Sequence, residues 1–572
     1  MDMKKAVSIL SVISAAALAA GVCGAAEEPA VTNDVKECTE MPFVYILKPD
    51  KILVDGAEDS AGRVKLSKIG ACYPKGFSAE DSAGRVKLST CFAFGHEVSV
   101  TVSGEAPISK VELIWNVSLP KDALVYGGDW ERTYGDSGWF SIEGSSAPHE
   151  GWKPWYCLVN DGKRTDGYGL MVQPNAFGSW KVDPERLLLS IDVRAGSRPL
   201  ELKGRELMAC TLVSRRGNDN ETPFKAGQAF CRMMCPKPRL PKEPVYGYND
   251  WYCAYGNNTA TNFLADAEFI VSLVKGELVR PYVVVDDGWQ RGKQGCAETT
   301  ADKRWAGVNE KWGMEMDEVA KRVKAMDAKP GLWYRPFLPD DGLPNEGLPM
   351  DPTDPALEKR IRTDMELFAA WGFELIKIDY ITFDWCVSWG GGLAPINHDL
   401  PEWSDRSRTT AEVVKGLYTA LREAAGDKMV IIGCNAIDHF AAGLFEIQRT
   451  GDDTSGNDWG RTRKMGPNTV GMRTIHHGTF YFADGDCFGL SDKDAVPWRL
   501  NSQWLDLVSR SGTALFVSWK RGLTTPEIRT ALEKALRRSA KVQPTGEPLD
   551  WQENLRPARW RFGSEIHNYK WE

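Results

Sequence analysis

After residue 244 the sequence alternates between short apolar runs and longer amphipathic runs. The helix-like runs include 317–328, 357–371, 409–425, 500–510 and 526–540. Eight strand–helix units in roughly 300 residues are typical of a barrel and not of an open, doubly wound sheet. We therefore expect a (β/α)8 TIM barrel over 245–540. Its eight strands should begin near Val245, Pro281, Gly331, Phe373, Met429, Phe445, Phe480 and Ala514.

The region before the barrel has a different period. Apolar and polar residues alternate at Val98, Val100 and Val102, and again from 111 to 119 and from 189 to 193. Such runs, separated by Gly, Pro, Asn and Asp, indicate strands joined by turns. We expect a multidomain chain with an N-terminal antiparallel β-sandwich over 27–235 and a proline-rich linker over 236–244. A short C-terminal β extension over 541–572 should follow the barrel.

The first 26 residues have the pattern of a secretory signal peptide. Lys4 and Lys5 precede an apolar stretch that ends at Val22, and small residues lead to Ala26. This pattern predicts cleavage after Ala26 and export to the periplasm or the exterior. A membrane anchor is disfavoured because the run is short and rich in alanine. A lipid anchor at Cys23 is disfavoured because Val22 is a poor residue before a lipidated cysteine.

Composition excludes several classes of function. A net charge of -8 leaves no basic footprint for nucleic acid. The 13 cysteines are scattered, and Cys231 and Cys235 lack a partner pair at zinc spacing. We expect no metal, no cofactor and no membrane span within the domains. The 22 tryptophans exceed ordinary usage, and their flat rings suit stacking on sugar faces. Residues 57–67 recur at 79–89, which indicates a local duplication without an assigned function.

Carboxylates follow two of the predicted barrel strands. Asp379 ends the fourth strand, and Asp453 closes the motif Arg449-Thr450-Gly451-Asp452-Asp453 after the sixth. Catalytic groups of such barrels lie at these strand ends. Two carboxylates that face one pocket are the minimum equipment for breaking a glycosidic bond. Lys377 shares a strand face with Asp379, so we expect its ammonium group to keep that carboxylate ionised. The proton donor should be Asp453, with a raised pKa; Asp452 is its nearest competitor.

Other polar residues follow the neighbouring strands. Asp286 and Asp287 end the second strand, where they could accept hydrogen bonds from sugar hydroxyls, cap a turn or bind a divalent metal. The metal is disfavoured because no histidine lies near them. Trp333 and Arg335 on the third strand should form an aromatic and cationic wall.

Four motifs in barrel order carry a family resemblance. They are Asp286-Asp287-Gly288-Trp289, Gly331-Leu332-Trp333, Lys377-x-Asp379 and Arg449-x-x-x-Asp453. The sequence resembles the α-galactosidase clan of glycoside hydrolases over about 248–519, and is most similar to compact bacterial members of family 36. The resemblance implies a retaining exo-glycosidase that hydrolyses terminal α-D-galactosyl residues of oligo- or polysaccharides through a covalent glycosyl-enzyme. No protein partner is implied, and the oligomeric state stays open.

The resemblance also implies roles for single residues. Asp379 would be the nucleophile and Asp453 the acid/base. Asp286 and Asp287 would bind the axial 4-hydroxyl and the 6-hydroxyl of the sugar. The remaining expected substrate-binding residues are Lys377 and Arg449 near the 2- and 3-hydroxyls, Cys434 near the 2-hydroxyl, Trp333, Trp251, and Trp130, which would reach the pocket from the sandwich.

Some positions depart from the family pattern and leave alternatives open. Asn435-Ala436-Ile437 stands where Ser-Gly-Gly is usual, and Arg335 replaces a small or acidic residue. An α-N-acetylgalactosaminidase, or another α-glycosidase or transglycosidase of the clan, is therefore the alternative. A catalytically silent sugar-binding protein is disfavoured because both carboxylates are present.

Three further features lie near the predicted strand ends. A long loop after the fourth strand carries Trp385, Trp389 and Trp403, which either stack on the aglycone or pack the loop. Asp384 is interpreted as loop. The segment 484–487 resembles a clan motif, and we expect a structural role for it.

Overall fold

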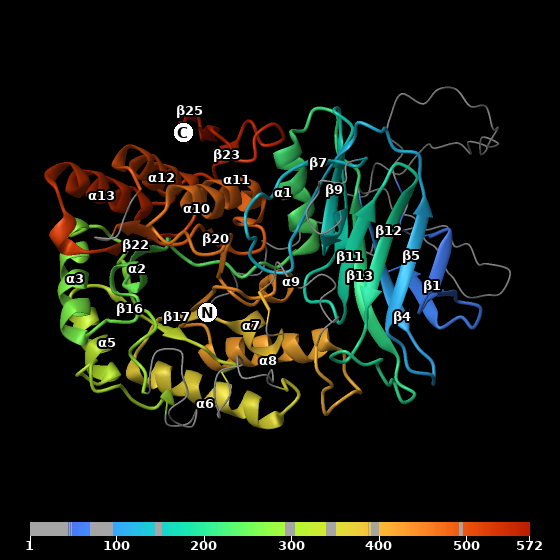
Figure 1. The fold of residues 1–572 in the computed structure, drawn as a ribbon, viewed down its shortest axis with the longest axis horizontal. Coiled ribbons are helices and arrows are strands. Elements are labelled where there is room, and N and C mark those ends of the chain that lie inside the picture. Colours follow the sequence, from blue (N-terminus) through green and yellow to red (C-terminus); the bar gives the residue numbers. More distant parts are fainter. Residues whose placement is uncertain are drawn as a thin grey trace, which may run out of the picture. The chain divides into compact units, whose positions relative to one another are not determined.

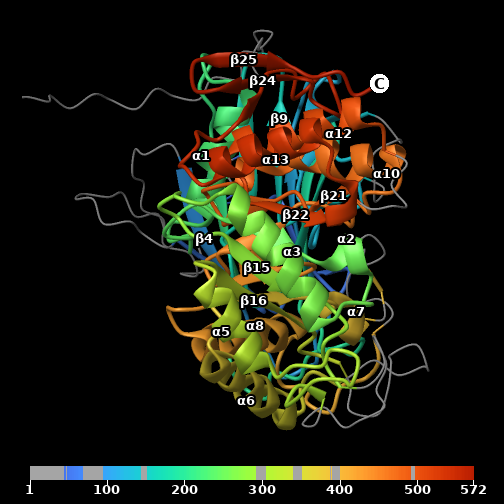
Figure 2. The ribbon, with the colours of Figure 1, turned by 90° about the vertical axis from the view of Figure 1, so that its left-hand side faces the viewer.

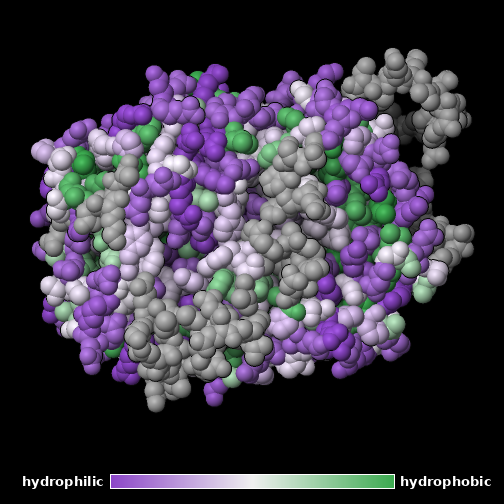
Figure 3. Space-filling model, in the orientation of Figure 1, coloured by the Kyte–Doolittle hydropathy of each residue, from purple (hydrophilic) through white to green (hydrophobic). Residues whose placement is uncertain are grey.

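The computed structural model describes residues 44, 46, 48–68, 95–143, 151–291, 304–338, 351–386, 388–389, 400–490 and 496–572. The expected signal peptide with Cys23, and the second copy of the repeated segment at 79–89, lie outside these residues. No helix in the described ranges is both long and apolar enough to cross a membrane. On the face drawn in Figure 3, the described residues are predominantly hydrophilic.

Two antiparallel sheets are built from the residues before α1 (Figure 1). The first has the order β2-β1-β5-β12-β11-β8, with β1 (Lys51–Val54), β2 (Ala57–Glu58), β5 (Lys110–Asn116), β8 (Lys153–Pro154), β11 (Phe177–Val182) and β12 (Arg186–Asp192). The second has the order β3-β4-β13-β10-β9-β6-β7, with β3 (Val64–Lys68), β4 (Gly95–Val102), β6 (Leu124–Gly127), β7 (Phe140–Ser141), β9 (Tyr156–Asn160), β10 (Thr165–Leu170) and β13 (Leu207–Arg215).

The period-two pattern sets which side of these strands is buried. Along β5 and β12 every second side chain is buried. Because side chains alternate between the faces of a strand, the buried residues of the two strands share one face. The antiparallel register places the buried residues opposite one another, as Val111 with Ile191, Leu113 with Leu189 and Trp115 with Leu187.

One helix interrupts the region expected to be entirely β, which corrects the prediction for 223–235. Helix α1 (Pro223–Met234) begins where Thr222 accepts a hydrogen bond from the backbone N–H of Lys225. Threonine at the cap and proline in the first turn are helix-start signals. The helix packs on β10 and β13, and a Cβ at Gly167 of β10 would lie 2.6 Å from the Phe230 ring. Glycine there allows the helix to approach the sheet.

A nine-stranded parallel sheet follows the proline-rich segment. Each of the eight predicted strands begins within two residues of its expected start, and β21 is added after β20. The order is β20-β19-β18-β17-β16-β15-β14-β22-β21, with β14 (Tyr246–Asn249), β15 (Tyr282–Val285), β16 (Lys329–Tyr334), β17 (Leu375–Ile378), β18 (Val430–Gly433), β19 (Ile447–Arg449), β20 (Phe482–Asp484), β21 (Phe488–Leu490) and β22 (Leu515–Trp519).

Hydrogen bonds also link β20, at one end of this strand order, with the start of β22 near the other end. The Ala514 N–H, directly before β22, donates to the Ala483 carbonyl of β20 at 2.9 Å. A parallel bridge pairs Asp484 with Ala514. The hydrogen bonding therefore runs from β14 through β20 and returns to β22, so the carboxyl ends of the strands meet around one centre.

The longer helices pack against one another in chain order (Figure 2). Helix α5 contacts α3 and α6, α6 contacts α8, and α13 contacts α12 and α3. At the start of α8, Thr409 and Glu412 form a reciprocal capping box. The bounds of these helices are α3 (Ala260–Leu273), α5 (Met316–Ala325), α6 (Pro355–Trp371), α8 (Thr410–Ala425), α12 (Trp498–Ser511) and α13 (Pro526–Ser539).

Short helices fill the connections, and three strands end the chain. The short helices are α2 (Trp251–Ala254), α7 (Ile381–Cys386), α9 (Asp438–Ala441), α10 (Trp459–Arg463), η4 (Lys464–Asn468), α11 (Thr469–Arg473), η5 (Thr474–His476) and η6 (Arg521–Leu523). The last three strands, β23 (Glu547–Pro548), β24 (Arg559–Phe562) and β25 (Glu565–Asn568), form an antiparallel sheet of their own.

The antiparallel sheets contact the parallel-sheet region directly, and residues 42–572 form one compact unit. The Tyr126 hydroxyl donates to the Met472 carbonyl at 3.0 Å. Arg205 forms an ion pair with Glu412 of α8 at 2.8 Å. The linker segment is also held, because Arg239 contacts Glu446 at 2.5 Å.

Candidate active site

A cavity of about 230 Å³ opens at the carboxyl ends of the parallel strands. Eight of the ten predicted site residues line it, and Cys434 and Trp130 do not. The eight are Trp251, Asp286, Asp287, Trp333, Lys377, Asp379, Arg449 and Asp453. The strand-end rule therefore brings together residues that are far apart in the sequence.

Asp379 lies directly after β17 and is held by two donors. The Trp333 indole N–H donates to Oδ2 at 3.1 Å, and the Tyr380 backbone N–H donates to Oδ1 at 2.8 Å. Tyr380 has a φ of 59°, so the chain leaves the sheet at once. Both contacts are made by groups that only donate, so each oxygen of Asp379 serves as an acceptor.

Lys377 does not make the contact that we expected. Its ammonium nitrogen lies 2.7 Å from Asp286 Oδ2, so its direct partner is Asp286 and not Asp379. Burial opposes the charge on Lys377, but Asp286 together with Cys434, Cys487 and Asp379 outweighs burial and raises the Lys377 pKa well above its ordinary value. The long side chain of Lys377 on β17 reaches past β16 to the end of β15. Asn249 adds a further hydrogen bond to Asp286 Oδ2 at 2.6 Å.

Asp287 is buried beside Asp286 and is less strongly paired. Its Oδ1 accepts a hydrogen bond from the Gln290 side chain at 2.6 Å. Burial raises the pKa of Asp287 to about 6. A second layer supports both residues, because the Asp286 N–H donates to Asp250 Oδ1 at 2.7 Å and Asn258 donates to the carbonyls of both aspartates.

The two acids after β19 differ in their partners. Asp452 Oδ1 lies 2.7 Å from Arg132, and its Oδ2 lies 2.7 Å from Arg461. Both cations near Asp453 contact its Oδ1, Arg449 at 3.2 Å and Arg132 at 3.7 Å, and its side chain is 41% exposed against 18% for Asp452. Asp453 is therefore the acid with the freer carboxyl group.

The direction of the Asp453 pKa is opposite to the one we expected. Loss of hydration inside the cavity favours the neutral acid, but the positive charges of Arg449, Arg132 and Lys377 outweigh this effect and lower the pKa of Asp453. The sequence showed Asp452 as a like charge beside Asp453. Folding adds Arg132 to the same site, which reverses the electrostatic balance.

The segment 484–487 makes the structural contacts expected of it. Asp486 Oδ2 accepts hydrogen bonds from the Tyr252 hydroxyl and from the Thr454 N–H, the latter at 2.8 Å. The same oxygen lies 3.2 Å from Arg449. Asp486 also lines the cavity. It thereby holds the Arg449 guanidinium and the chain beyond Asp453.

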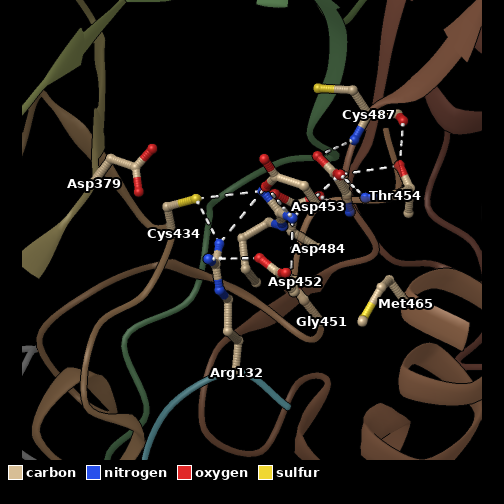
Figure 4. Close-up of polar contacts among 12 residues, drawn as sticks. Arg132, Asp379, Cys434, Gly451, Asp452, Asp453, Thr454, Met465, Asp484 and Cys487 are labelled. Atoms are coloured by element: carbon tan, nitrogen blue, oxygen red, sulfur yellow. Dashed lines mark hydrogen bonds and ion pairs between the residues drawn. The ribbon is translucent and has the colours of Figure 1, made fainter. Parts of the chain in front are cut away.

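Cys434 lies behind two guanidinium groups and does not line the cavity. Arg449 Nη1 is 3.3 Å and Arg132 Nη1 is 3.5 Å from its sulfur (Figure 4). Burial raises the Cys434 pKa well above its ordinary value. Its thiol is therefore neutral, and the arginines present their charge to the cavity in its place.

Trp130 does not line the cavity as predicted, but two other residues of the same segment do. The Trp130 ring packs edge-on against Trp155 at 4.8 Å and Phe177 at 5.5 Å, inside the antiparallel region. Arg132 and Tyr134, which the sequence interpretation missed, line the cavity instead. The charged pair Glu131-Arg132 in an apolar β region was the available signal, because buried charges persist only where they are paired.

Arg335 and Asp384 also differ from expectation. Asp384 belongs to α7 and not to a loop, and it is fully buried in a two-pronged contact with Arg335. The Arg335 guanidinium lies 4.1 Å from the centre of the Tyr380 ring. This ion pair fixes the chain next to Asp379, and Arg335 does not line the cavity.

The three loop tryptophans separate into two groups. Trp385 and Trp403 are buried, and their ring centres lie 6.3 Å apart. These two residues therefore agree with the interpretation that the tryptophans pack the loop. Trp389 lines the cavity and stacks on Phe383 at 4.7 Å. Trp251 lines the cavity and contacts Tyr255 at 5.5 Å.

Comparison with known proteins gives matches among solved structures only. No protein-family model and no curated protein matches the sequence. The α-galactosidase TtGalA from Thermus thermophilus, in complex with p-nitrophenyl α-D-galactopyranoside, is 17% identical with a TM-score of 0.55, covering 83% of this chain and 97% of that one. The GH36 α-galactosidase AgaA from Geobacillus stearothermophilus is 12% identical with a TM-score of 0.57, covering 90% and 79%.

A third structure agrees with these two. The α-galactosidase from Lactobacillus brevis is 11% identical with a TM-score of 0.53, covering 86% of this chain and 72% of that one. The fold is that of GH36 α-galactosidases. The resemblance carried by the four motifs is thus confirmed at the level of the fold.

Proposed function

We propose that the chain is a retaining exo-glycosidase that hydrolyses terminal α-D-galactosyl residues through a covalent glycosyl-enzyme. One observation carries the proposal: Asp379 after β17 and Asp453 after β19, with β18 between the two strands, line the same cavity and are held in different ways. Retaining hydrolysis needs one carboxylate to attack and a second to transfer protons. The volume of about 230 Å³ lies below the ~300–1,000 Å³ of pockets for larger ligands, which suits a single terminal sugar.

Asp379 is assigned as the nucleophile because both of its oxygens serve as hydrogen-bond acceptors. The donors Trp333 and Tyr380 hold its two oxygens without neutralising them. The carboxyl group is thus oriented before substrate binds. Its attack on the anomeric carbon would form the glycosyl-enzyme and release the aglycone.

Asp453 is assigned as the acid/base because its carboxyl group is the more accessible of the two candidates. Asp452 is engaged by an arginine on each oxygen, whereas Asp453 keeps a freer oxygen toward the cavity. In the first step Asp453 would protonate the departing oxygen, and in the second it would remove a proton from water.

The other cavity residues are assigned to the sugar hydroxyls. Asp286 and Asp287 supply acceptors, and Lys377 and Arg449 supply donors. Because each charge already has a partner, a bound hydroxyl joins an existing network and needs no bare charge. We assign the 4- and 6-hydroxyls to the two aspartates and the 2- and 3-hydroxyls to the two cations.

The proposal includes the finer architecture and the export of the chain. We take the parallel sheet as a (β/α)8 barrel over 245–540, the two N-terminal sheets as a sandwich, and the last three strands as an extension. Residues 1–26 would be removed on export, which N-terminal sequencing of the mature protein checks.

A panel of 4-nitrophenyl α-glycosides tests the function. The α-galactoside should be cleaved, and proton NMR should show the α-anomer of galactose before mutarotation. The α-N-acetylgalactosaminide and the α-glucoside should be poor substrates. Preference for either of these would overturn the substrate assignment, and initial release of the β-anomer would overturn the retaining mechanism. Asp183→Asn, which changes an exposed pair with Arg186, serves as the control variant.

A further inference from the structure

Residues 130–134, here called the strap, run beside the loop that carries Asp452 and Asp453. The Thr133 N–H donates to the Thr450 carbonyl at 3.0 Å, and the Asp452 N–H donates to the Thr133 carbonyl at 3.0 Å. These two bonds form a parallel bridge between Thr133 and Gly451. The strap therefore behaves as a short extra strand on the acid/base loop.

The strap is itself fastened to the parallel-sheet region. The Trp130 carbonyl accepts from the Asp438 N–H at 2.8 Å, and the Glu131 carbonyl accepts from Arg473 at 2.6 Å. The Glu131 carboxylate also accepts a hydrogen bond from Thr382 of α7. These contacts hold the strap against α9, α11 and α7. The strap can shift relative to these helices only if the contacts break.

The acid/base loop is enclosed from the other side as well. A Cβ at Gly451 would lie 2.3 Å from the Met465 carbonyl and 2.6 Å from Thr469 Oγ1. Glycine is therefore required where the loop passes between the strap and η4. The strap and η4 therefore enclose the backbone just before Asp453 from both sides.

The Arg132 side chain carries a positive charge from the strap to the cavity. Its side chain is 5% exposed, lies 2.7 Å from Asp452 and 3.7 Å from Asp453, and donates to the Cys434 sulfur. In Figure 4 it reaches up from the strap to Cys434 and Asp452. A buried guanidinium is costly unless it is paired, and the backbone bridge already joins strap and loop. The positive charge of Arg132 is therefore not needed to hold the strap to the acid/base loop.

We propose that the strap is a working part of the acid/base machinery, in which the Thr133–Gly451 bridge and the Arg132–Asp452 ion pair hold Asp453 in position for proton transfer. Asp452 then serves as the anchor for Arg132 and not as the proton donor. This proposal rests on the proposed function, and Arg132 is a positioning residue within it.

The charge of Arg132 also acts on the ionisation of Asp453. Removing one of the cations that lower its pKa must raise that pKa. A donor with a higher pKa stays protonated to higher pH, so the alkaline limb of kcat/KM should move upward. The titratable and charged groups that face Asp453 from the strap, β17, β19, α2 and the neighbouring loops are Arg132, Lys377, Arg449, Tyr252, Tyr380, Asp452 and Asp486.

The test compares Arg132→Gln and Arg132→Lys in the full chain with Arg205→Gln. Arg205 also joins the antiparallel sheets to the parallel-sheet region, through Glu412, but lies outside the cavity lining. Arg132→Gln should lower the maximal kcat/KM for a galactoside with a poor leaving group by at least tenfold. Its alkaline limb should lie at higher pH. Arg132→Lys should restore the limb, and Arg205→Gln should match the wild type in both.

Substrates with different leaving groups distinguish a positioning role of Arg132 from a general loss of structure. Departure of 2,4-dinitrophenol needs no proton, so Arg132→Gln should keep kcat/KM for the 2,4-dinitrophenyl galactoside within about threefold. Equal losses on both substrates, or an unchanged pH profile in a folded variant, would overturn the proposal. If Arg132→Gln does not fold, Asp452→Asn breaks the same pair from the loop side and should give the same leaving-group dependence; absence of that dependence overturns the proposal too. A wild type without α-glycosidase activity would instead refute the proposed function.

Discussion

At the scale of single residues, two cations of the cavity are paired with carboxylates that follow other strands, whereas Asp379 is not part of either pair. Lys377 with Asp286 and Arg449 with Asp486 are buried pairs, and neither involves the proposed nucleophile. Asp379 is held by neutral donors. This division leaves the oxygens of the attacking carboxyl group to neutral donors, while the ion pairs hold the other side chains of the pocket in place.

The two acids after β19 should respond differently to substitution. Asp453→Ala should abolish hydrolysis of galacto-oligosaccharides, while the 2,4-dinitrophenyl galactoside still forms the glycosyl-enzyme and azide yields the α-galactosyl azide. Asp452→Ala should weaken hydrolysis without stopping it, because Asp452 only anchors Arg132. Steady-state kinetics on both substrates makes the comparison. Near-normal rates on oligosaccharides for Asp453→Ala would move the donor role to Asp452.

The pH profile follows from the lowered Asp453 pKa. The donor must carry its proton when substrate binds, and its pKa lies below the ordinary value of about 3.9 in the free protein. Wild-type kcat/KM should therefore fall as pH rises and be greatest on the acid side of neutrality. A profile with its alkaline limb above about pH 7 would contradict the electrostatic balance assigned to Arg449 and Arg132.

At the scale of elements, the strands and the acids at their ends could be predicted from the sequence. The contacts that these acids make with distant segments could not. Apolar runs and the acids after them are local, so β17 with Asp379 and β15 with Asp286 could be placed from the sequence. The partner of Lys377, the burial of Asp384 and the approach of Arg132 to Asp452 depend on segments brought together by folding. Helix α1 was missed despite the local signal Thr222-Pro223, because the β pattern before it was extended too far.

The Arg335–Asp384 pair that joins β16 to α7 should stabilise the fold beside the nucleophile. Both side chains are almost fully buried, so Asp384→Asn leaves an unpaired guanidinium and should cost about 3–5 kcal/mol. Arg335→Met with Asp384→Leu should cost less than the single change. Urea unfolding measures both. Asp183→Asn, from an exposed pair, should cost no more than about 1 kcal/mol. Equal effects at the two sites would show that the buried pair is not structural.

At the scale of the whole molecule, the antiparallel sheets supply part of the cavity. Arg132 and Tyr134 line it, and the strap holds the acid/base loop. The N-terminal region was expected to reach the pocket through Trp130, and it does so through Arg132 and Tyr134 instead. The site is thus shared by two regions of one compact unit.

A chain that begins at Pro244 should therefore be inactive. It lacks Arg132 and the bridge to Gly451, and it exposes the surface that Tyr126 and Tyr156 cover. Circular dichroism reports whether the shortened chain folds, and hydrolysis of the 2,4-dinitrophenyl galactoside reports activity. A folded, shortened chain with wild-type turnover on oligosaccharides would exclude a role of the N-terminal region in catalysis.

The most direct test of the central claim is to trap the glycosyl-enzyme and locate it. A 5-fluoro-α-galactosyl fluoride should inactivate the wild type and add one sugar to the chain, and peptide mass spectrometry should place that sugar on Asp379. Asp379→Gly should take up no label, and azide should restore turnover with formation of the β-galactosyl azide. A sugar on any other residue, or steady hydrolysis by Asp379→Gly without azide, would contradict the account.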